Sequence, residues 1–504
     1  MPISDAFHVY DTTLRDGAQR EGITYSVEDK LAVARLLDDF GVGFIEGGWP
    51  GALPKDTEFF ARMAAGEVTL RNAQLVAFGS TRKAGVAAQD DAQVKALVDS
   101  QAPVITLVAK SDVWHVEQAL KTTREENLAM ISDTVAYLVG LGRRVFVDFE
   151  HFFDGYKHDS DYGVAAVTAA ISAGADVAVL CDTNGGMLPS GIGRIVTDVL
   201  QRTGARLGIH CQDDTGCAIA NSIAAIEAGA THVQCTANGY GERTGNADLF
   251  SVVGNIELKL GIQVLPEGKL ADMVRVSHAL AELANLPPDT HQPYVGISSF
   301  AHKAGLHASA LKINPELYNH IDASLVGNDM RILVTEMAGR ASVELKGREL
   351  GYDLSDHPEA ITKVVEQVKD LEAHGWSFEA ADASFELLLL SAISGNPTRK
   401  FDVESWRTIV EQREDGFVVS EATVKLRVGG ERIIATAEGN GPVNALDNAM
   451  RTALLRRYPE MGSIELVDYK VRILDGGQGT GAVTRVLIES ADGNRRWHTV
   501  GVHG

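Results

Sequence analysis

Hydrophobic positions in the first half of the chain form short runs separated by longer amphipathic segments. The runs predict strands at His8–Leu14, Gly43–Gly47, Ala73–Phe78, Val104–Val108, Arg144–Phe149, Asp176–Cys181, Arg206–His210 and His232–Thr236. Segments between them have helical periodicity, as in 27–40, 89–100, 117–141, 163–173, 192–202 and 218–228. Alternating strands and helices favour parallel pairing, and this number of units predicts a (β/α)8 TIM barrel over residues 1–286. The alternative, an open doubly wound sheet, lacks a Gly-x-Gly-x-x-Gly turn after the first strand.

The barrel pattern stops after about residue 270. A helix is expected over 270–285, and beyond the Pro287-Pro288 break two further helices are expected over 357–378 and 381–394, so 287–403 is predicted to be a helical linker subdomain. From residue 404 the hydrophobic pattern predicts a β-β-α-β-β-β unit. The predicted fold is therefore an α/β barrel, a linker subdomain and a C-terminal α+β domain over 404–504. That last domain carries no candidate catalytic residue, which favours a regulatory or dimerisation role.

Composition and charge narrow the class of protein. Hydrophobic residues make up 45% and charged residues 23%, as in globular proteins. A formal charge of −22 argues against nucleic acid or an anionic membrane as the main partner, so an anionic substrate needs a local basic site or a metal. The 4 cysteines form no Cys-x-x-Cys pair, and no signal peptide is recognisable, which together predict a reducing cytoplasm.

Active sites of such barrels lie at the carboxyl ends of the strands, so the first polar residues after each run are the candidates. After the first four runs they are Arg15, Asp16, Gln19, Glu46, Ser80, Thr81 and Lys110, and after the last four Glu150, His151, Asp182, Thr183, Asn184, His210, Gln212, Asp214, Asn238, Glu242, Arg243 and Asn246. Helix capping explains any one of them but hardly all, so this density predicts an enzyme. The adjacent Arg15 and Asp16 are costly to bury unless they bind something, such as a carbonyl oxygen and a cation.

Three segments carry a family resemblance. They are Asp11-Thr-Thr-Leu-Arg-Asp-Gly-Ala-Gln19, His210-Cys-Gln-Asp-Asp-Thr-Gly216 and Gly241-Glu-Arg-Thr-Gly-Asn-Ala247. Together they resemble the α-isopropylmalate synthase-like enzymes, which include the homocitrate synthases, and the likeness runs from residue 7 to about 501. The resemblance implies a TIM-barrel enzyme that joins acetyl-CoA to a 2-oxo acid with a divalent metal, in a homodimer whose subunits share active-site elements. Members commonly carry a further helix after this point, so the C-terminal tail is expected to be short.

The predicted metal ligands are of mixed type. Hard divalent cations bind carboxylate, imidazole and carbonyl oxygen, and Asp16 and His210 supply the first two. The family usually has His-x-His at the second segment, whereas this chain has Gln212, whose neutral amide oxygen shifts the expectation from Zn²⁺ toward Mn²⁺ or Mg²⁺. Gln212 either binds the cation or only supports a residue that does. The resemblance implies Asn246 as the fourth ligand.

The resemblance also implies roles for residues that touch the substrates. Arg15 would polarise the ketone of the 2-oxo acid, and Thr183 would hold its carboxylate. Gln19 and His302 are expected as further substrate-binding residues.

Removing a proton from the acetyl-CoA methyl group requires a base, for which the candidates are Glu150, His302 and His307. In the resembling enzymes a linker histidine reaches over the barrel mouth, often that of the neighbouring subunit. This favours His307, with Tyr318 nearby, and leaves Glu150 to orient the methyl group or to act in the proton relay.

One segment bears on the substrate. Asp148-Phe-Glu-His-Phe-Phe-Asp-Gly-Tyr-Lys157 resembles the citramalate synthase branch, which implies condensation of acetyl-CoA with pyruvate to (R)-citramalate and CoA on the route to isoleucine. Phe78, Leu107 and Phe149 are expected to fill the space that an isopropyl group would need. The alternatives are a 2-isopropylmalate synthase using 2-oxoisovalerate, a metal-dependent lyase or aldolase, and a non-catalytic binding protein. An amino-acid effector, isoleucine or leucine, is expected on the C-terminal domain.

Overall fold

The computed structural model describes residues 5–396, 399–412, 414 and 416–504. They form two compact units, one running up to Phe300 together with Ile321–Asp329, and the other comprising Ala301–His320 and Met330–Gly504. In the described ranges, no helix combines the length and the apolar character needed to cross a membrane.

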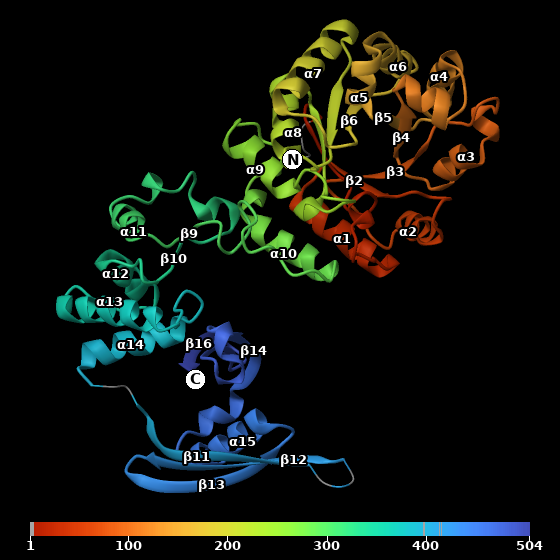
Figure 1. Ribbon diagram of the computed structural model, residues 1–504. Helices are drawn as coiled ribbons and strands as arrows, with labels where there is room; N and C mark the ends of the chain where they lie inside the picture. Colours follow the sequence, from red (N-terminus) through yellow and green to blue (C-terminus); the bar gives the residue numbers. More distant parts are fainter. Residues whose placement is uncertain (1–4, 397–398, 413, 415) are drawn as a thin grey trace. The chain divides into compact units, whose positions relative to one another are not determined.

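The first unit contains a closed barrel of parallel strands in the order β1 to β8, coloured from red to yellow-green in Figure 1. The strands are β1 (His8–Asp11), β2 (Phe44–Gly48), β3 (Gln74–Ser80), β4 (Val104–Lys110), β5 (Arg144–Glu150), β6 (Val177–Asp182), β7 (Leu207–Cys211) and β8 (His232–Cys235). The predicted TIM barrel and all eight of its strands are confirmed, with small differences at the strand ends. Closure comes from β1 and β8, where His8 pairs with His232 and Asp11 with Cys235.

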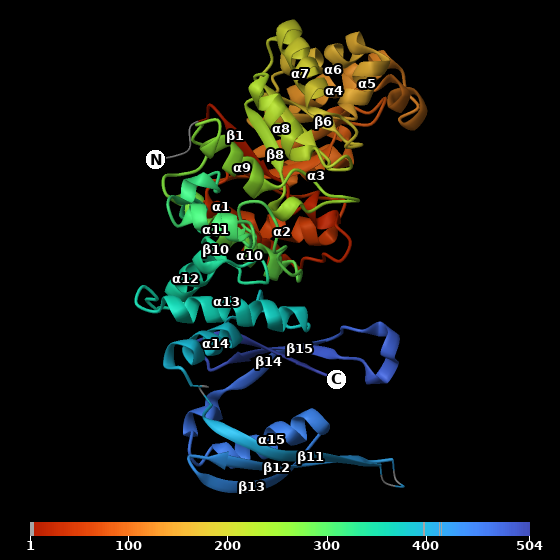
Figure 2. The ribbon, with the colours of Figure 1, turned by 60° about the vertical axis from the view of Figure 1, so that its left-hand side comes forward.

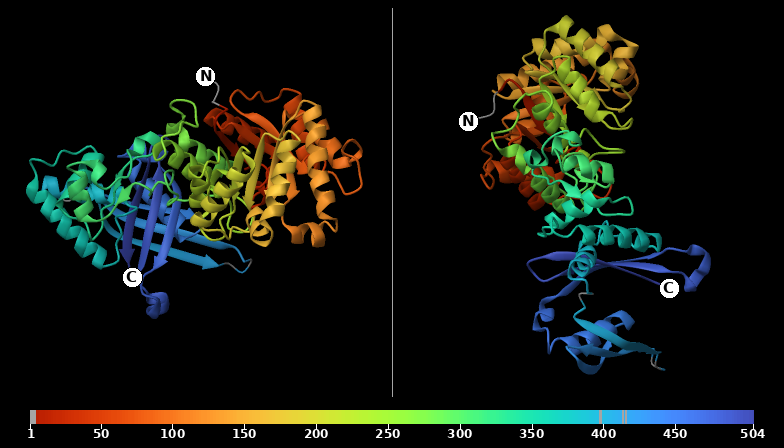
Figure 3. Two further views of the ribbon diagram at one scale, coloured as in Figure 1. Left: turned by 90° about the horizontal axis from the view of Figure 1, so that it is seen from above. Right: turned by 90° about the vertical axis from the view of Figure 1, so that its left-hand side faces the viewer.

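Helices cover the outside of the barrel (Figures 1 and 3). They are α1 (Val27–Phe40), α2 (Pro54–Ala64), α3 (Ala92–Asp99), α4 (Arg124–Gly140), α5 (Phe152–His158), α6 (Ser160–Ser172), α7 (Pro189–Thr203), α8 (Ala218–Glu227), α9 (Leu249–Leu258) and α10 (Met273–Leu283). Local sequence sets their ends, as in α1, where Ser26 and Asp29 form a capping box and Gly41 stops the helix at φ 103°. The hydrophobic pattern did not predict α2, α5 or α9.

Strand parity decides which residues reach the active end, because successive side chains of a strand point to opposite faces. On β5, Phe146 lies in a buried cluster inside the barrel with Tyr10 and Val104, whereas Phe149 packs outward in the main core. Asp148 and Glu150 share the inward parity of Phe146. The interior is thus aromatic and aliphatic at its base and polar toward the carboxyl ends of the strands.

The second unit begins with two short parallel strands and four helices. These are β9 (Ala301–His302), α11 (Gly305–Leu311), β10 (Arg331–Ile332), α12 (Arg340–Glu349), α13 (Pro358–Ala373) and α14 (Asp382–Ser394). Val343, Val364 and Phe385 join α12, α13 and α14 in a buried core. The two long helices expected beyond the proline pair are confirmed as α13 and α14.

Two antiparallel sheets follow, each of three strands (Figures 2 and 3). The first has β11 (Phe401–Gln412), β12 (Val418–Val428) and β13 (Glu431–Gly439), with α15 (Pro442–Leu454) packed on it, and the second has β14 (Glu465–Ile473), β15 (Thr484–Ala491) and β16 (Arg496–His503). The predicted β-β-α-β-β-β unit is confirmed as β12, β13, α15, β14, β15 and β16, and the prediction missed β11, which precedes it. Most β11 side chains are exposed, so no buried alternation marks that strand in the sequence. The domain division at residues 286 and 403 stays a prediction.

Candidate active site

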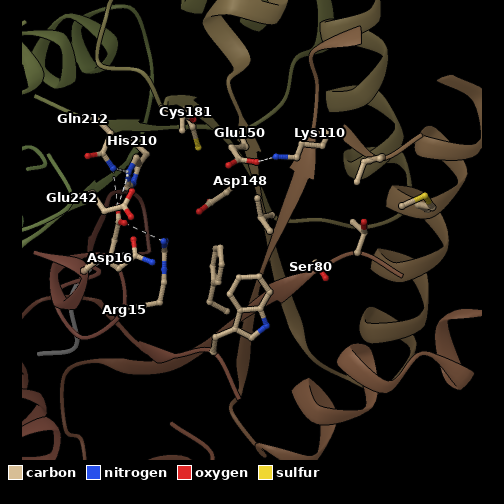
Figure 4. A pocket seen from close by; sticks show the side chains of 18 of the residues that line it. Arg15, Asp16, Ser80, Lys110, Asp148, Glu150, Cys181, His210, Gln212 and Glu242 are labelled. Atoms are coloured by element: carbon tan, nitrogen blue, oxygen red, sulfur yellow. Dashed lines mark hydrogen bonds and ion pairs between the residues drawn. The ribbon is translucent and has the colours of Figure 1, made fainter. Parts of the chain in front are cut away.

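Polar side chains from the carboxyl ends of the strands meet in a cavity of about 640 Å³ in the first unit. The residues predicted to bind substrate or metal or to act in catalysis that line it are Arg15, Asp16, Gln19, Glu150, Thr183, His210 and Gln212, and the further strand-end candidates that line it are Ser80, Thr81, Lys110, Glu242 and Arg243. Figure 4 shows Asp16, His210, Gln212 and Glu242 on one side of the cavity and Lys110 with Glu150 on another. Residues remote in sequence therefore share one site, as expected at this end of a barrel.

Arg15 is fixed on three sides. Its Nε donates to Oε2 of Glu46 over 2.6 Å, its Nη1 lies 3.4 Å from Oδ1 of Asp16, and its Cζ lies 3.9 Å from the centroid of the Phe78 ring. Glu46 is fully buried and also accepts hydrogen bonds from the hydroxyls of Tyr10 and Thr12. A guanidinium carries five N–H groups in a planar fork, so donors remain for a ligand in the cavity. The sequence singled out Glu46 as a polar residue but not its contact with Arg15.

Asp16 and His210 face each other, with Nε2 of His210 3.2 Å from Oδ2 of Asp16. Burial tends to raise the pKa of Asp16, but the adjacent Arg15 charge and the His210 hydrogen bond outweigh it and hold that pKa well below its usual range. Burial tends to lower the pKa of His210, and the Asp16 carboxylate outweighs this, so the pKa of His210 is raised. The pair therefore favours positive charge beside an ionised carboxylate.

Two side-chain amide oxygens in this region lack a hydrogen-bond partner. Within the described part of the chain, Oε1 of Gln212 and Oδ1 of Asn246 are buried without a hydrogen-bond partner. Gln212 Nε2 lies 3.1 Å from Oδ2 of Asp16 and 3.3 Å from Nε2 of His210. A half-turn of the Gln212 amide puts its oxygen in that place, since the two ends of the amide are similar in shape.

These residues fit a hard divalent cation. Among the residues that the structure describes, no three His, Cys, Asp or Glu side chains come together as a metal site. A cation beside Asp16 and His210 therefore depends on amide oxygens, and two buried, unpartnered ones are present at Gln212 and Asn246. Buried polar atoms are rarely left unpaired, so both are candidates to ligate. Oxygen-rich ligand sets suit Mg²⁺ and Mn²⁺.

The loop after β8 brings Asn246 to the site. Asn246 forms an isolated bridge with Gln212, and its Nδ2 donates to the carbonyl of Tyr240 over 2.9 Å. The loop is tight: Gly245 has φ 99°, and a Cβ there would clash with the carbonyl oxygen of Gly239. Only glycine adopts such a conformation at little cost. The loop backbone thus determines where the Asn246 amide lies.

Across the cavity, Glu150 forms an ion pair with Lys110, which fixes the orientation of the Glu150 carboxylate. Burial lowers the pKa of Lys110. Thr183 Oγ1 accepts a hydrogen bond from the backbone N–H of His151 over 2.8 Å, so its own hydroxyl proton is free to donate. His151 has φ 55°, an uncommon conformation for a non-glycine residue, and this conformation aims its N–H at Thr183.

The remaining predicted residues lie in the second unit. The rings of His307 and Tyr318 stack with centroids 4.1 Å apart, and the ring of His302 lies 6.0 Å from that of His307. His302 Nε2 is 2.8 Å from Oδ1 of Asn319. The structure thus brings these three residues together, and their approach to a barrel mouth stays a prediction.

The floor of the cavity differs from the sequence expectation. Phe78 lines the cavity, but Leu107 and Phe149 are fully buried in the core outside the barrel, so their predicted role in filling the substrate space is wrong. Strand parity explains this, because the inward neighbours are Val108 and Asp148. Trp49, which the sequence did not single out, meets Phe78 edge to face at 5.2 Å. Burial raises the pKa of Asp148, and the nearby Glu46 charge adds to this.

Comparison with known families covers most of the chain in three segments. Residues 6–280 match the family described as HMGL-like. Residues 294–375 match the homocitrate synthase post-HMGL domain-like family, and residues 379–504 match the LeuA allosteric (dimerisation) domain.

Similar curated proteins extend over nearly the full length. The chain is 66% identical over 500 residues to the (R)-citramalate synthase of Streptomyces coelicolor, which is 99% of this chain and 93% of that protein. It is 49% identical over 508 residues to the (R)-citramalate synthase of a Synechocystis species, covering 98% and 92%. The corresponding protein of Aquifex aeolicus is 46% identical over 502 residues, covering 99% and 94%.

Proposed function

The chain belongs to the (R)-citramalate synthases of the HMGL-like family and is an acyltransferase, and from this premise we propose how its barrel site joins acetyl-CoA to pyruvate. In this reaction the methyl carbon of acetyl-CoA loses a proton and forms a bond to the ketone carbon of pyruvate. Water then cleaves the thioester, giving (R)-citramalate and CoA. The site must therefore stabilise charge on the ketone oxygen and accept a proton from the methyl group.

The observation that carries the proposal is the meeting of Arg15 with Asp16, His210 and two unpartnered amide oxygens. We assign Asp16, His210, Gln212 and Asn246 as the residues that hold a divalent cation. When bound, such a cation polarises the ketone and neutralises charge that develops on its oxygen.

The protein's own groups then divide the remaining work. Arg15, held by Glu46 at 2.6 Å, presents its free N–H groups to the ketone oxygen. Thr183, whose oxygen is already occupied by the His151 N–H, donates its hydroxyl proton to the pyruvate carboxylate, and Gln19 contributes a further polar contact from the cavity wall.

We assign removal of the proton from the acetyl-CoA methyl group to two residues, Glu150 and His307. Glu150, oriented by Lys110, faces the methyl group from the barrel wall. His307, stacked on Tyr318, accepts the proton, and His302 assists substrate binding from the same cluster. Because these last three residues belong to the second unit, this part of the proposal requires that unit to reach a barrel mouth, in the same or a second subunit.

The cavity supports a small 2-oxo acid together with a thioester. Its volume of about 640 Å³ exceeds what pyruvate needs, so space remains for the acetyl-CoA arm. Phe78 and Trp49 line the cavity, and the Phe78 ring lies against Arg15; we assign these two rings the role of limiting the side chain of the 2-oxo acid beside the ketone.

The C-terminal segment matches an allosteric (dimerisation) domain, and we propose that the chain acts as a homodimer inhibited by isoleucine.

The cysteine thiols of the chain are free, and Cys181, Cys211 and Cys235 are buried, which supports a place in the reducing cytoplasm.

The test is an assay of CoA release with acetyl-CoA and a series of 2-oxo acids. We expect turnover with pyruvate to exceed that with 2-oxobutanoate and 2-oxoisovalerate, and to disappear on chelation and return with Mn²⁺ or Mg²⁺. Preference for 2-oxoisovalerate would indicate a 2-isopropylmalate synthase. Cleavage of citramalate with no acetyl-CoA present would indicate a lyase, and activity that survives complete chelation would contradict the cation site.

A further inference from the structure

Three hydrogen-bonded side chains, two of which line the cavity, cross the barrel interior at the cavity floor. Nδ1 of His210 lies 2.9 Å from Oε1 of Gln234, and Nε2 of Gln234 donates to Oδ1 of Asp148 over 2.8 Å. His210 and Gln234 are register partners on β7 and β8, so their side chains lie side by side, while Asp148 comes from β5. Gln234 is 1% exposed and Asp148 4% exposed, so water does not compete for these bonds. Neither residue is among the predicted ligands.

The direction of each hydrogen bond between these three side chains follows from the carboxyl group of Asp148 at one end. The NH₂ end of the Gln234 amide donates to Asp148, and the ionised form of that carboxyl, which has no donor, accepts only this orientation of the amide. The amide oxygen must then face His210, where it accepts a proton from Nδ1. With Nδ1 holding its proton, it is Nε2 that gives up a proton and offers a lone pair when a cation takes the place of the imidazolium charge. Nε2 is the atom 3.2 Å from Asp16 and 3.3 Å from the Gln212 amide. The nitrogen that can bind a cation is therefore the one that faces the proposed ligands.

We propose that Gln234 and Asp148 are positioning residues that hold His210 in the tautomer and ring orientation required for a divalent cation. Asp148 acts through Gln234 rather than on the cation directly. Partners of this kind commonly change metal affinity by about 10- to 100-fold when they are removed. The inference rests on the cation site of the proposed function and names how that site is built.

The test measures Mn²⁺ binding to the full-length protein by electron paramagnetic resonance and by calorimetry, with no substrate present. Gln234→Met keeps the length of the side chain but loses both its donor and its acceptor. We expect its dissociation constant for Mn²⁺ to rise by about 10- to 100-fold. Gln367→Met is the matched control, because Gln367 lies on α13 in the second unit, and its Mn²⁺ affinity should equal that of the unmodified protein.

A double variant separates positioning from charge. Asp148→Asn removes a negative charge near the cation and also loses the selection of one amide end, because an amide offers Gln234 both a donor and an acceptor. The effect of charge persists without Gln234, whereas the positioning effect requires it. We therefore expect Asp148→Asn to weaken Mn²⁺ binding several-fold more in the unmodified protein than in the Gln234→Met background.

Outcomes are distinguishable. A folded Gln234→Met variant that binds Mn²⁺ within about twofold of the unmodified protein overturns the inference, as do equal effects of Asp148→Asn in both backgrounds. If Gln234→Met does not fold, Gln234→Leu replaces it in the same cycle. If neither variant folds, Asp148→Asn decides on its own, and unchanged Mn²⁺ affinity in that variant overturns the inference. If the unmodified protein binds no divalent cation at all, it is the proposed function that fails.

Discussion

Replacing Arg15 by lysine keeps one positive charge but removes the planar fork. In the structure a single guanidinium donates to Glu46 over 2.6 Å, lies 3.4 Å from Asp16 and still has N–H groups for the cavity. Lysine has one ammonium, and the fully buried Glu46 will hold it, because leaving a buried carboxylate unpaired is more costly than losing a contact to substrate. The ketone oxygen then loses its donor. Removing one such donor costs about 10²- to 10³-fold in kcat, or about 2.7–4 kcal/mol.

The assay is steady-state CoA release with saturating pyruvate and acetyl-CoA. We expect kcat to fall by at least about 100-fold while the KM for pyruvate changes much less, since the charge develops in the transition state. Arg144→Lys is the control: Arg144 lies at the start of β5, at the other end of the barrel, and pairs with Asp5 and Asp176. Its kcat should be unchanged. A folded Arg15→Lys variant with kcat within about threefold of the unmodified protein refutes the assigned role of Arg15.

Three further predictions concern the cation, acidity and regulation. Gln212→His should tighten Zn²⁺ binding relative to Mg²⁺ and Gln212→Ala should raise the cation concentration needed for activity, whereas superimposable titrations would place Gln212 outside the ligands. Burial, aided by the Arg206 charge, lowers the pKa of His8 to about 4, and burial also lowers the pKa of His232. Because the folded protein binds these two protons less readily than the unfolded chain does, the free energy of unfolding should be highest above about pH 6.5 and should fall as the pH is lowered toward 4. Calorimetric melting should show this loss, smaller in His8→Gln, and a flat profile would contradict it. Deleting residues from 404 onward should abolish inhibition by isoleucine, a coupling of about 1–3 kcal/mol; if the full-length protein ignores isoleucine, leucine and valine, the domain does not act as a sensor.

Periodicity predicted the barrel strands and most of the helices between them. It missed the short α5 and the largely exposed β11, and it also missed α2 and α9, of which α9 is buried on nearly all sides and shows no single apolar face. The strands of the barrel are buried on both faces and appear as short apolar runs, whereas most helices between them bury one face, so the two patterns can be told apart in the sequence. Helix α5 begins at Phe152, with one residue between it and the end of β5, and its seven residues are too few for a helical period to show. Strand β11 has twelve residues that are largely exposed, and its pairing with β12 leaves no pattern in hydrophobicity.

The residues of the site also fall into two groups, those that the sequence indicates and those that it does not. Arg15, Asp16, His210 and Gln212 lie at or after the ends of the predicted strands, which is why the sequence indicates them, and the structure brings them into one cavity. Asp148 and Gln234 lie inside the strands, where a polar residue in an apolar run gives no sign of its direction. Shared parity with Glu150, two residues later on the same strand, is the signal that would have identified Asp148. The orientation of the Gln234 amide depends on a partner from another strand, which a single sequence does not specify.

The tight loop after β8 has a consequence for inherited variation. Gly245 contributes no side-chain chemistry to the site, yet any residue with a Cβ at this position would clash with the carbonyl oxygen of Gly239. An allele that replaces Gly245 should therefore displace Asn246 and resemble a direct loss of that residue. Mutational surveys of this gene should find intolerance concentrated at backbone-defining positions as well as at the reactive side chains, so tolerance maps that score side-chain chemistry alone will underestimate how much of the loop is under selection.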